Sequence, residues 1–283
     1  QTNIVISSEG MALKEMLYSL SEEEEYDDVI INKEVAENIV DENTLLIIVD
    51  THKQNYVEVP SLIEKTNKIA IIDHHRKSAD FIKQSILTFH EVYASSASEL
   101  VTELLQYTSN ETTLTTFEAE SLYGGIMVDT KNFTFKTGVR TFEASAYLKK
   151  TGLDITELKH MFQNDFETYM AKVNIVKNAE IIDGKIAMSI CKEEHENISV
   201  ITAQAADELL SITGVVASFV LCEQNGTVNI SGRSLGDINV QAILEKMGGG
   251  GHITFAGAQL TGITAEEAKE KLLGIIEEYS LKD

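Results

Sequence analysis

The chain of 283 residues contains no tryptophan, one proline and two cysteines. The two cysteines, Cys191 and Cys222, are too few for a disulfide framework, lack the spacing of a zinc ribbon and fit a reducing compartment. No apolar run is long enough to span a membrane, and no signal peptide is visible. We therefore expect this chain to be soluble and cytoplasmic.

Positive charge is scarce as well, since 23 Lys and Arg residues stand against 45 Asp and Glu residues and the net charge is -22. A charge of this sign argues against broad binding to a nucleic-acid backbone, so we expect no long nucleic acid as partner. What the chain does have is a hydrophobic content of 43%, which allows a buried core. Its length suits two domains.

The first half of the sequence alternates apolar runs with helical periodicity, which is typical of a parallel sheet wrapped by helices. We expect strands at 3–7, 28–31, 45–50, 69–73, 87–90 and 124–129. Helices are expected near 10–20, 34–39, 60–66, 96–108, 117–124 and 141–150. The predicted fold class is therefore α/β, with a parallel-sheet domain over residues 1–155.

Beyond this domain the pattern of apolar segments and turn residues changes. Continuous helical periodicity predicts a connecting helix over 156–179, and turn residues at Asp183-Gly184 and Asn225-Gly226 then separate shorter strands. The expected strands lie at 180–183, 185–191, 198–201, 215–222 and 227–232, and the expected helices at 203–211, 238–247 and 264–279. Residues 180–283 are thus predicted to form a smaller α/β domain with a mixed sheet.

Three apolar runs each end in an acid: Asp50, Asp73 and Asp129, and Asp73 is followed by His74 and His75. Functional groups collect at the carboxyl ends of strands in open α/β sheets, and Asp and His are ligands of catalytic divalent metals. A lone strand-end Asp is commonly a helix cap, so the argument depends on the three together. Adjacent histidines point in different directions, so one is expected to bind metal and the other to face a substrate. Asp73 would hold one imidazole in its correct tautomer, and Asp50, one histidine and Asp129 would hold one ion.

A glycine run, Gly248 to Gly251, precedes His252. Glycines permit close backbone approach and expose amides, as an anion cradle requires. Upstream, Arg233 offers a bidentate fork with the hydroxyls of Ser231 and Ser234 nearby. The alternative is a flexible glycine loop with a structural arginine, and we favour the anion site.

These motifs together resemble those of the DHH phosphoesterase superfamily over nearly the whole chain. The matching segments are Val49-Asp50-Thr51-His52, Asp73-His74-His75, Val128-Asp129-Thr130 and Gly248-Gly249-Gly250-Gly251-His252. Further segments are similar to the GdpP type of cyclic-di-AMP phosphodiesterase: Tyr93-Ala94-Ser95-Ser96, Thr141-Phe142-Glu143-Ala144, Ala205-Ala206-Asp207-Glu208-Leu209-Leu210 and Ser231-Gly232-Arg233-Ser234-Leu235-Gly236.

The resemblance implies a manganese-dependent hydrolase that opens cyclic di-AMP to linear pApA by attack of a water activated by two metal ions. It implies that Asp50 bridges the ions, that His74 and Asp129 bind the second ion, and that His75 lies beside the scissile phosphate. The implied substrate-binding residues are Arg233, Ser231, Gly249, Gly250, Gly251 and His252, with Thr130 and Arg140 as weaker candidates. Pairing of two chains through their DHH domains is also common in the family, so a homodimer is expected.

One family motif is missing from the chain. Family members carry His-x-x-x-Asp-x-Asp on their first strand, whereas the first histidine here is His52. We therefore expect an N-terminally incomplete DHH domain with weak or no activity. The resemblance also implies a membrane-anchored parent protein with a PAS domain and a degenerate GGDEF domain upstream. Two alternatives stay open: a nanoRNase that cuts pApA and short oligonucleotides, and a dinucleotide-binding module without catalysis.

Overall fold

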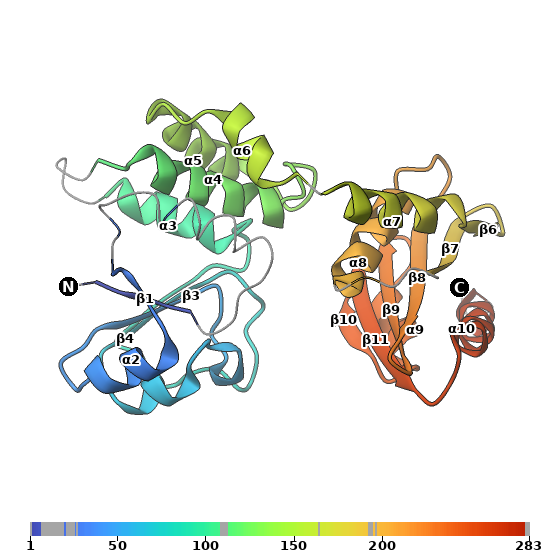
Figure 1. Cartoon of the computed structure of the whole chain (residues 1–283), viewed down its shortest axis with the longest axis horizontal. Coiled ribbons are helices and arrows are strands. Elements are labelled where there is room, and N and C mark those ends of the chain that lie inside the picture. Colours follow the sequence, from blue (N-terminus) through green and yellow to red (C-terminus); the bar gives the residue numbers. More distant parts are fainter. Residues whose placement is uncertain are drawn as a thin grey trace. The chain divides into compact units, whose positions relative to one another are not determined.

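A computed structural model of the protein (Figure 1) describes residues 2–6, 20, 26, 28–107, 113–163, 165–191, 195 and 197–280. The chain forms two compact units, Gln1–Gln163 and Asn164–Asp283. Nearly all of the helix expected over 10–20 lies outside the described residues. Among the described residues, no helix combines the length and the apolar character needed to cross a membrane.

The first unit contains a parallel sheet of three strands in the order β3 (Leu46–Val49), β4 (Ile69–Asp73) and β5 (Leu87–His90). Every residue of the central strand β4 is buried, which explains the apolar run Ile69–Ile72 that precedes Asp73. Successive side chains of β4 enter different cores: Ile71 contacts Ile48 and Ile63, whereas Ile72 contacts Leu100. The predicted parallel sheet is confirmed.

Short elements complete the sheet region of this unit. Strands β1 (Ile4–Val5) and β2 (Ile30–Ile31) form a separate parallel pair. Helix α2 (Lys33–Ile39) begins at Asn32, whose side chain accepts a hydrogen bond from the Val35 amide, and the segment Pro60–Glu64 is a 3-10 helix. The two pack together through Ala36 and Leu62.

Four helices form a second core in the first unit (Figure 1): α3 (Ala97–Leu105), α4 (Thr116–Asp129), α5 (Val139–Lys150) and α6 (Ile155–Met161). Their buried side chains include Tyr123, Ile126, Leu148 and Leu158. Helix α3 also lies on β4, so the helical layer and the sheet meet at the end of β4 where Asp73 stands.

The strand expected over 124–129 was wrong, because these residues are the last turns of α4. A capping box between Thr115 and Glu118 starts this helix. The segment resembles a strand in the sequence because it is a short apolar run, a pattern that helices and strands share, although in the helix Gly124 and Ile126 are buried and Val128 is exposed. Gly125 marks the close contact, since a Cβ there would lie 2.2 Å from the Ser98 hydroxyl of α3.

The second unit contains one mixed sheet of six strands, which confirms the predicted mixed α/β character. The order is β10-β11-β9-β8-β7-β6, and only the β7–β8 pair is parallel. The strands are β6 (Glu180–Ile182), β7 (Ile186–Cys191), β8 (Ala217–Gln224), β9 (Thr227–Ser234), β10 (Gly250–His252) and β11 (Phe255–Thr261). The turns predicted at Asp183-Gly184 and Asn225-Gly226 are confirmed by positive φ at all four residues.

Helices cover both faces of this sheet. Helices α9 (Val240–Glu245) and α10 (Ala265–Ser280) pack on a core that includes Met188 and Phe219. Helices α7 (Phe166–Lys177) and α8 (Ile198–Leu209) pack on the other face, where Val220 is buried. Alternation along β8 separates the two cores.

Two expectations for this half of the chain differ from the structure. The strand expected at 198–201 was wrong, because these residues begin α8 and bury Ile198 and Ile201 as a helical face. Instead of one helix over 156–179 there are two, α6 and α7. The second helix begins at Asp165, whose carboxylate accepts the Thr168 amide at 2.8 Å.

Candidate metal centre

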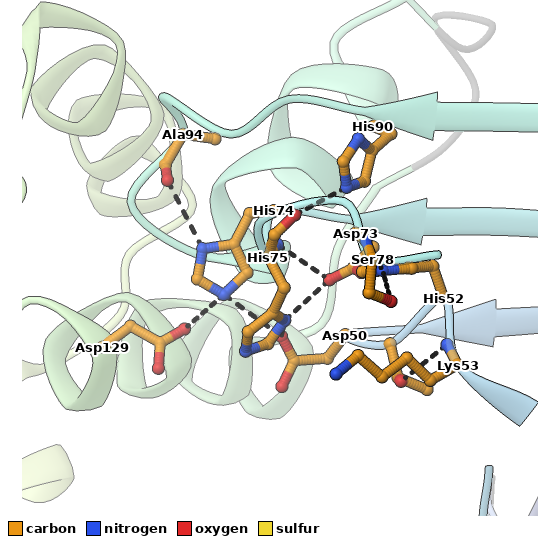
Figure 2. Close-up of polar contacts among 11 residues, drawn as sticks. Asp50, His52, Lys53, Asp73, His74, His75, Ser78, His90, Ala94 and Asp129 are labelled. Carbon is orange, nitrogen blue, oxygen red and sulfur yellow. Dashed lines mark hydrogen bonds and ion pairs between the residues drawn. The ribbon is translucent and has the colours of Figure 1, made fainter. Parts of the chain in front are cut away.

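Asp50, His74 and Asp129 come from three separate elements and meet at one point (Figure 2). Asp50 follows β3, His74 follows β4, and Asp129 is the last residue of α4. The His74 Nε2 atom lies 3.3 Å from Asp50 Oδ1 and 3.6 Å from Asp129 Oδ2. One imidazole nitrogen and two carboxylates from distant parts of the sequence therefore converge.

The backbone at Asp50 is in the left-handed region, with φ of 63°. Its amide still donates to the Ile72 carbonyl at 2.9 Å, so the strand pairing continues to this residue before the chain turns. A residue other than glycine in this conformation costs free energy, and such strain is often found where a side chain has to be aimed. Here the turn aims the carboxylate at His74 and His75.

His74 is buried, and its ring is held so that Nε2 faces the two carboxylates. Its Nδ1 lies 3.4 Å from the Ala94 carbonyl oxygen, which can only accept a hydrogen bond. Nδ1 can therefore donate to this carbonyl, and Nε2 faces Asp50 and Asp129, where it is available to a metal ion. A carbonyl partner of this kind is the usual outer contact of a metal-binding histidine.

A buried polar network holds the Ala94 segment in place. The hydroxyls of Ser95 and Thr141 donate to the same oxygen, Glu99 Oε2, at 2.6 and 2.7 Å. The network joins the loop before α3 to the first turn of α5. It supplies a physical reason for the hydroxyl residues Ser95 and Thr141, which lie in two segments that carried the family resemblance.

The ligand atoms of Asp50, His74 and His75 all lie within 4.8 Å of one another, close enough to hold an ion, and Asp129 adjoins His74. Two ligand atoms bound at right angles about 2.1 Å from an ion lie about 3 Å apart, close to the 3.3 and 3.6 Å separations around His74 Nε2. Burial raises the pKa of Asp129, and the charge of Asp50 adds to this effect while His74 opposes it. A cation between these groups would relieve the repulsion between the carboxylates.

His75 lies beside this group and is held by Asp73. Its Nδ1 is 2.8 Å from Asp73 Oδ1, and its backbone amide donates to the same oxygen at 3.1 Å. This hydrogen bond raises the pKa of His75 against the effect of burial. The ring is 55% exposed and stands 4.5 Å from the ring of His74, centroid to centroid. Its Nδ1 also lies 3.8 Å from Asp50 Oδ1, so the ring stands beside the convergent ligands.

Asp73 is a fully buried carboxylate with a second histidine partner, His52. Burial alone would raise the pKa of Asp73, but hydrogen bonds from His75 and His52 outweigh it and hold this pKa well below its usual range. The side chains of His52, Asp73 and His90 also lie close enough to hold an ion. Three of their four ring nitrogens have partners, however: His52 contacts Asp73 and Ser78, and His90 Nε2 donates to the His75 carbonyl at 2.6 Å. We interpret this trio as support for His75.

The sequence reasoning assigned no role to His52 or His90. The available signal was the segment Val49-Asp50-Thr51-His52, in which His52 follows the expected metal ligand by two positions. The signal for His90 was weaker, because this histidine ends β5 before Glu91 alone, with no Asp and no second histidine beside it. In the structure its strand pairs with the end of β4, and Asp73 is its register partner.

Two weaker substrate candidates are engaged elsewhere. The Thr130 side chain is fully buried, donates to the Ile126 carbonyl at 2.6 Å and accepts the Phe133 amide at 2.9 Å. The Arg140 guanidinium makes a bidentate pair with Glu103, including a 2.6 Å bond from Nε. Thr130 therefore shapes the turn after α4, and Arg140 ties α5 to α3.

In the second unit, Arg233 lies on β9 and is largely buried. Its Nε donates to Asp207 Oδ1 of α8 at 3.1 Å, and one terminal nitrogen donates to the Gly232 carbonyl at 3.0 Å. Ser231 lies two residues before it on the same face of the strand. The guanidinium is thereby held in a defined orientation.

The glycine run forms the edge strand β10 and the turn before it, not a free loop. A Cβ at Gly249 would lie 2.2 Å from the Gly257 carbonyl, and one at Gly251 would lie 2.5 Å from the Phe255 carbonyl. At Gly250 a Cβ would meet no described atom within 4 Å. Two of the glycines are thus required by close packing on β11. His252 stacks on Phe255 with a 5.5 Å centroid separation and a 14° interplanar angle.

Comparisons with known proteins agree with the division of the chain into two units. Residues 7–126 match the DHH family, N-terminal domain, and residues 183–280 match the DHHA1 domain. The chain is 44% identical to cyclic-di-AMP phosphodiesterase GdpP of Geobacillus thermodenitrificans over 88% of the chain and 38% of that protein. It is 40% identical to cyclic-di-AMP phosphodiesterase PdeA of Listeria monocytogenes over 97% of the chain and 42% of that protein. The chain thus spans about two fifths of the length of these relatives.

Solved structures show the same fold. An exopolyphosphatase-related protein from Bacteroides fragilis is similar with a TM-score of 0.84 and 22% identity, over 99% of this chain and 84% of that chain. More distant curated relatives include the bifunctional oligoribonuclease and PAP phosphatase NrnA of Thermus thermophilus, 25% identical over 92% of the chain and 76% of that protein.

Proposed function

This chain belongs to the DHH family and carries a DHHA1 domain, and on that premise we propose that it is a metal-dependent phosphodiesterase that hydrolyses cyclic di-AMP to linear pApA. The observation that carries the proposal is the convergence of Asp50, His74 and Asp129 in a chain that is 40–44% identical to cyclic-di-AMP phosphodiesterases. The proposed cofactor is Mn²⁺, two ions in the complete enzyme. Other divalent ions suit the same ligands.

The proposed roles follow from the geometry of the side chains. Asp50, His74 and Asp129 would hold metal, and bound divalent ions would supply Lewis acidity for a phosphate and make a water molecule more acidic. His75, oriented by Asp73 through Nδ1, would direct Nε2 at the scissile phosphate.

In the DHHA1 domain, the proposed contacts to the dinucleotide come from β9 and β10. Arg233 is the main candidate, because Asp207 pre-orients its guanidinium and charge-assisted bonds to phosphate are strong. The other candidates are Ser231, Gly249, Gly250, Gly251 and His252. Cyclic di-AMP and pApA are the proposed small-molecule partners. A homodimer and a membrane-anchored parent protein are further parts of the proposal.

Product analysis tests the proposed reaction. The chain is incubated with Mn²⁺ and either cyclic di-AMP or pApA, and the products are separated by chromatography. We expect slow conversion of cyclic di-AMP to pApA, which Asp50→Asn and His74→Asn abolish. The matched control, His160→Asn, changes an exposed histidine on α6 and should retain the wild-type rate.

The same assay separates the two alternatives. Faster cleavage of pApA than of cyclic di-AMP would favour an oligoribonuclease of the NrnA type, the name carried by the more distant relatives. Binding of cyclic di-AMP without hydrolysis of either substrate, and without dependence on Mn²⁺, would favour a nucleotide-binding module. Either result would overturn the proposal.

A further inference from the structure

His52 is a buried histidine two residues after Asp50, and its ring connects two parts of the metal-site region. On one side, Nδ1 bonds Asp73 Oδ2; on the other, Nε2 lies 3.1 Å from the Ser78 amide nitrogen and 3.0 Å from the Ser78 hydroxyl. His52 and Asp73 are almost completely excluded from solvent. A polar residue buried in this way is retained only if its hydrogen bonds are made.

The partners of His52 determine which ring nitrogen carries the proton. The Ser78 backbone amide can only donate, so Nε2 of His52 is the acceptor. In the neutral ring the proton is then on Nδ1, which donates to Asp73. The direction of this hydrogen bond is set by the fold, because Ser78 lies in the loop after β4 and its amide cannot reverse its role.

Asp73 receives donors on both oxygens. Oδ2 accepts from His52, and Oδ1 accepts the amide and Nδ1 of His75 at 3.1 and 2.8 Å. With both oxygens engaged, the carboxylate cannot rotate without losing a bond in a buried site. The plane of the Asp73 carboxylate therefore determines where the half-exposed ring of His75 points.

We propose that His52 is a positioning residue for His75: by donating to Asp73 Oδ2, it fixes the carboxylate that orients the His75 imidazole toward the substrate. The expected effect on kcat rests on the proposed phosphodiesterase function, whereas the expected effect on the orientation of the His75 ring does not. It assigns His52 no contact with metal or substrate. Residues in this kind of supporting position typically change activity by about 10- to 100-fold.

Two substitutions separate the hydrogen bond from the volume of the ring. In His52→Asn, the side-chain amide nitrogen can occupy the place of Nδ1 and still donate to Asp73. In His52→Leu, the volume is similar but no donor remains. We expect His52→Leu to lower kcat about 10- to 100-fold with KM changed less than about threefold, and His52→Asn to recover most of this loss. Mn²⁺ affinity, measured by electron paramagnetic resonance, should be unchanged in both.

A double-mutant cycle tests whether His52 acts through His75. In a His75→Asn background, His52→Leu should cause little further loss of kcat. The proposal would be overturned by an equal loss of kcat in both backgrounds or by a parallel loss of Mn²⁺ affinity. It would also be overturned if folded His52→Asn failed to recover activity. Should His52→Leu fail to fold, His52→Met, which also has no donor, replaces it.

A second measurement needs neither metal nor substrate and so fails independently of the proposed function. Nitrogen NMR of the histidine-labelled chain should show His52 protonated at Nδ1 and not at Nε2. Replacement of His52 by leucine should shift the ring signals of His75, which lies on the far side of Asp73, and His52→Asn should restore these signals. Unchanged His75 signals in His52→Leu, or protonation of His52 at Nε2, would refute the positioning role.

Discussion

Replacement of Gly249 by alanine should destabilise the second unit, whereas the same change at Gly250 should not. The added Cβ at position 249 would lie 2.2 Å from the Gly257 carbonyl oxygen and 2.9 Å from the Ala258 Cα. These are backbone atoms of β11, which is paired with β9 over seven residues on its other side and cannot retreat. The clash therefore has to be relieved by separating β10 from β11.

The magnitude follows from the cost of overpacking a tight contact, typically 1–3 kcal/mol and occasionally more. Because the contact is with backbone, we expect the upper part of this range, about 3 kcal/mol. For a unit of this size, that lowers the midpoint of thermal unfolding by roughly 10 °C. Gly250 has no described atom within 4 Å of an added Cβ and no positive φ, so Gly250→Ala should change stability by less than about 0.5 kcal/mol.

Calorimetry of the whole chain, with urea unfolding followed by circular dichroism, measures both variants. The packing argument would be refuted if Gly249→Ala were as stable as the wild type, or if the two substitutions lowered the free energy of unfolding equally. The pair also bears on ligand binding. If the exposed backbone at Gly250 contacts an anion, Gly250→Ala should weaken binding of cyclic di-AMP while leaving the unfolding transition in place.

Three further perturbations test other parts of the structure. Asp129→Asn should raise the melting temperature of the metal-free chain, because burial and the charge of Asp50 disfavour the charged form of the Asp129 carboxyl. The same change should abolish the stabilisation that Mn²⁺ gives the wild type in a thermal-shift assay. A lower melting temperature of the metal-free variant would contradict the role of burial. Thr130→Val should lower the free energy of unfolding in urea by about 1–2 kcal/mol, because two hydrogen bonds of the buried hydroxyl are lost. The control Thr134→Val changes an exposed hydroxyl and should lower it by less than about 0.5 kcal/mol. Equal effects of the two substitutions would count against the structural role of Thr130. Thiol reagents should not react with folded chain, since a hydrogen bond shared with Cys191 and burial raise the pKa of Cys222; rapid labelling before unfolding would contradict this.

Much of the fold was predictable because its signals are local. Buried parallel strands have continuous apolar sequences, as in β4, and paired turn residues such as Asn225-Gly226 adopt positive φ with little regard to their surroundings. The prediction was wrong at 124–129 and 198–201, where the sequence has short apolar segments and the structure has helices that leave Val128 and Val200 exposed. Such segments are alike in buried helices and buried strands, and only contacts such as Gly125 with Ser98 distinguish them.

The candidate site was predictable in its residue types but not in its connections. Asp50, the His74-His75 pair and Asp129 were expected to meet, and the structure brings them together. Yet Asp129 arrives from the end of a helix, and Thr130 has both hydrogen-bonding roles of its hydroxyl satisfied within its own turn. A motif shows which atoms are present without showing which of them remain free.

By itself, then, the sequence determined the chemistry available to this protein: carboxylates and imidazoles after buried segments, an arginine, and a run of glycines before His252. Tertiary structure alone decided how each is used. It joined His52 to Asp73 across 21 positions and Arg140 to Glu103 across 37, and it pressed Gly249 against β11. The physical reason is that a polar group is free for metal or substrate only where the fold gives it no other partner, and those partners come from distant parts of the chain.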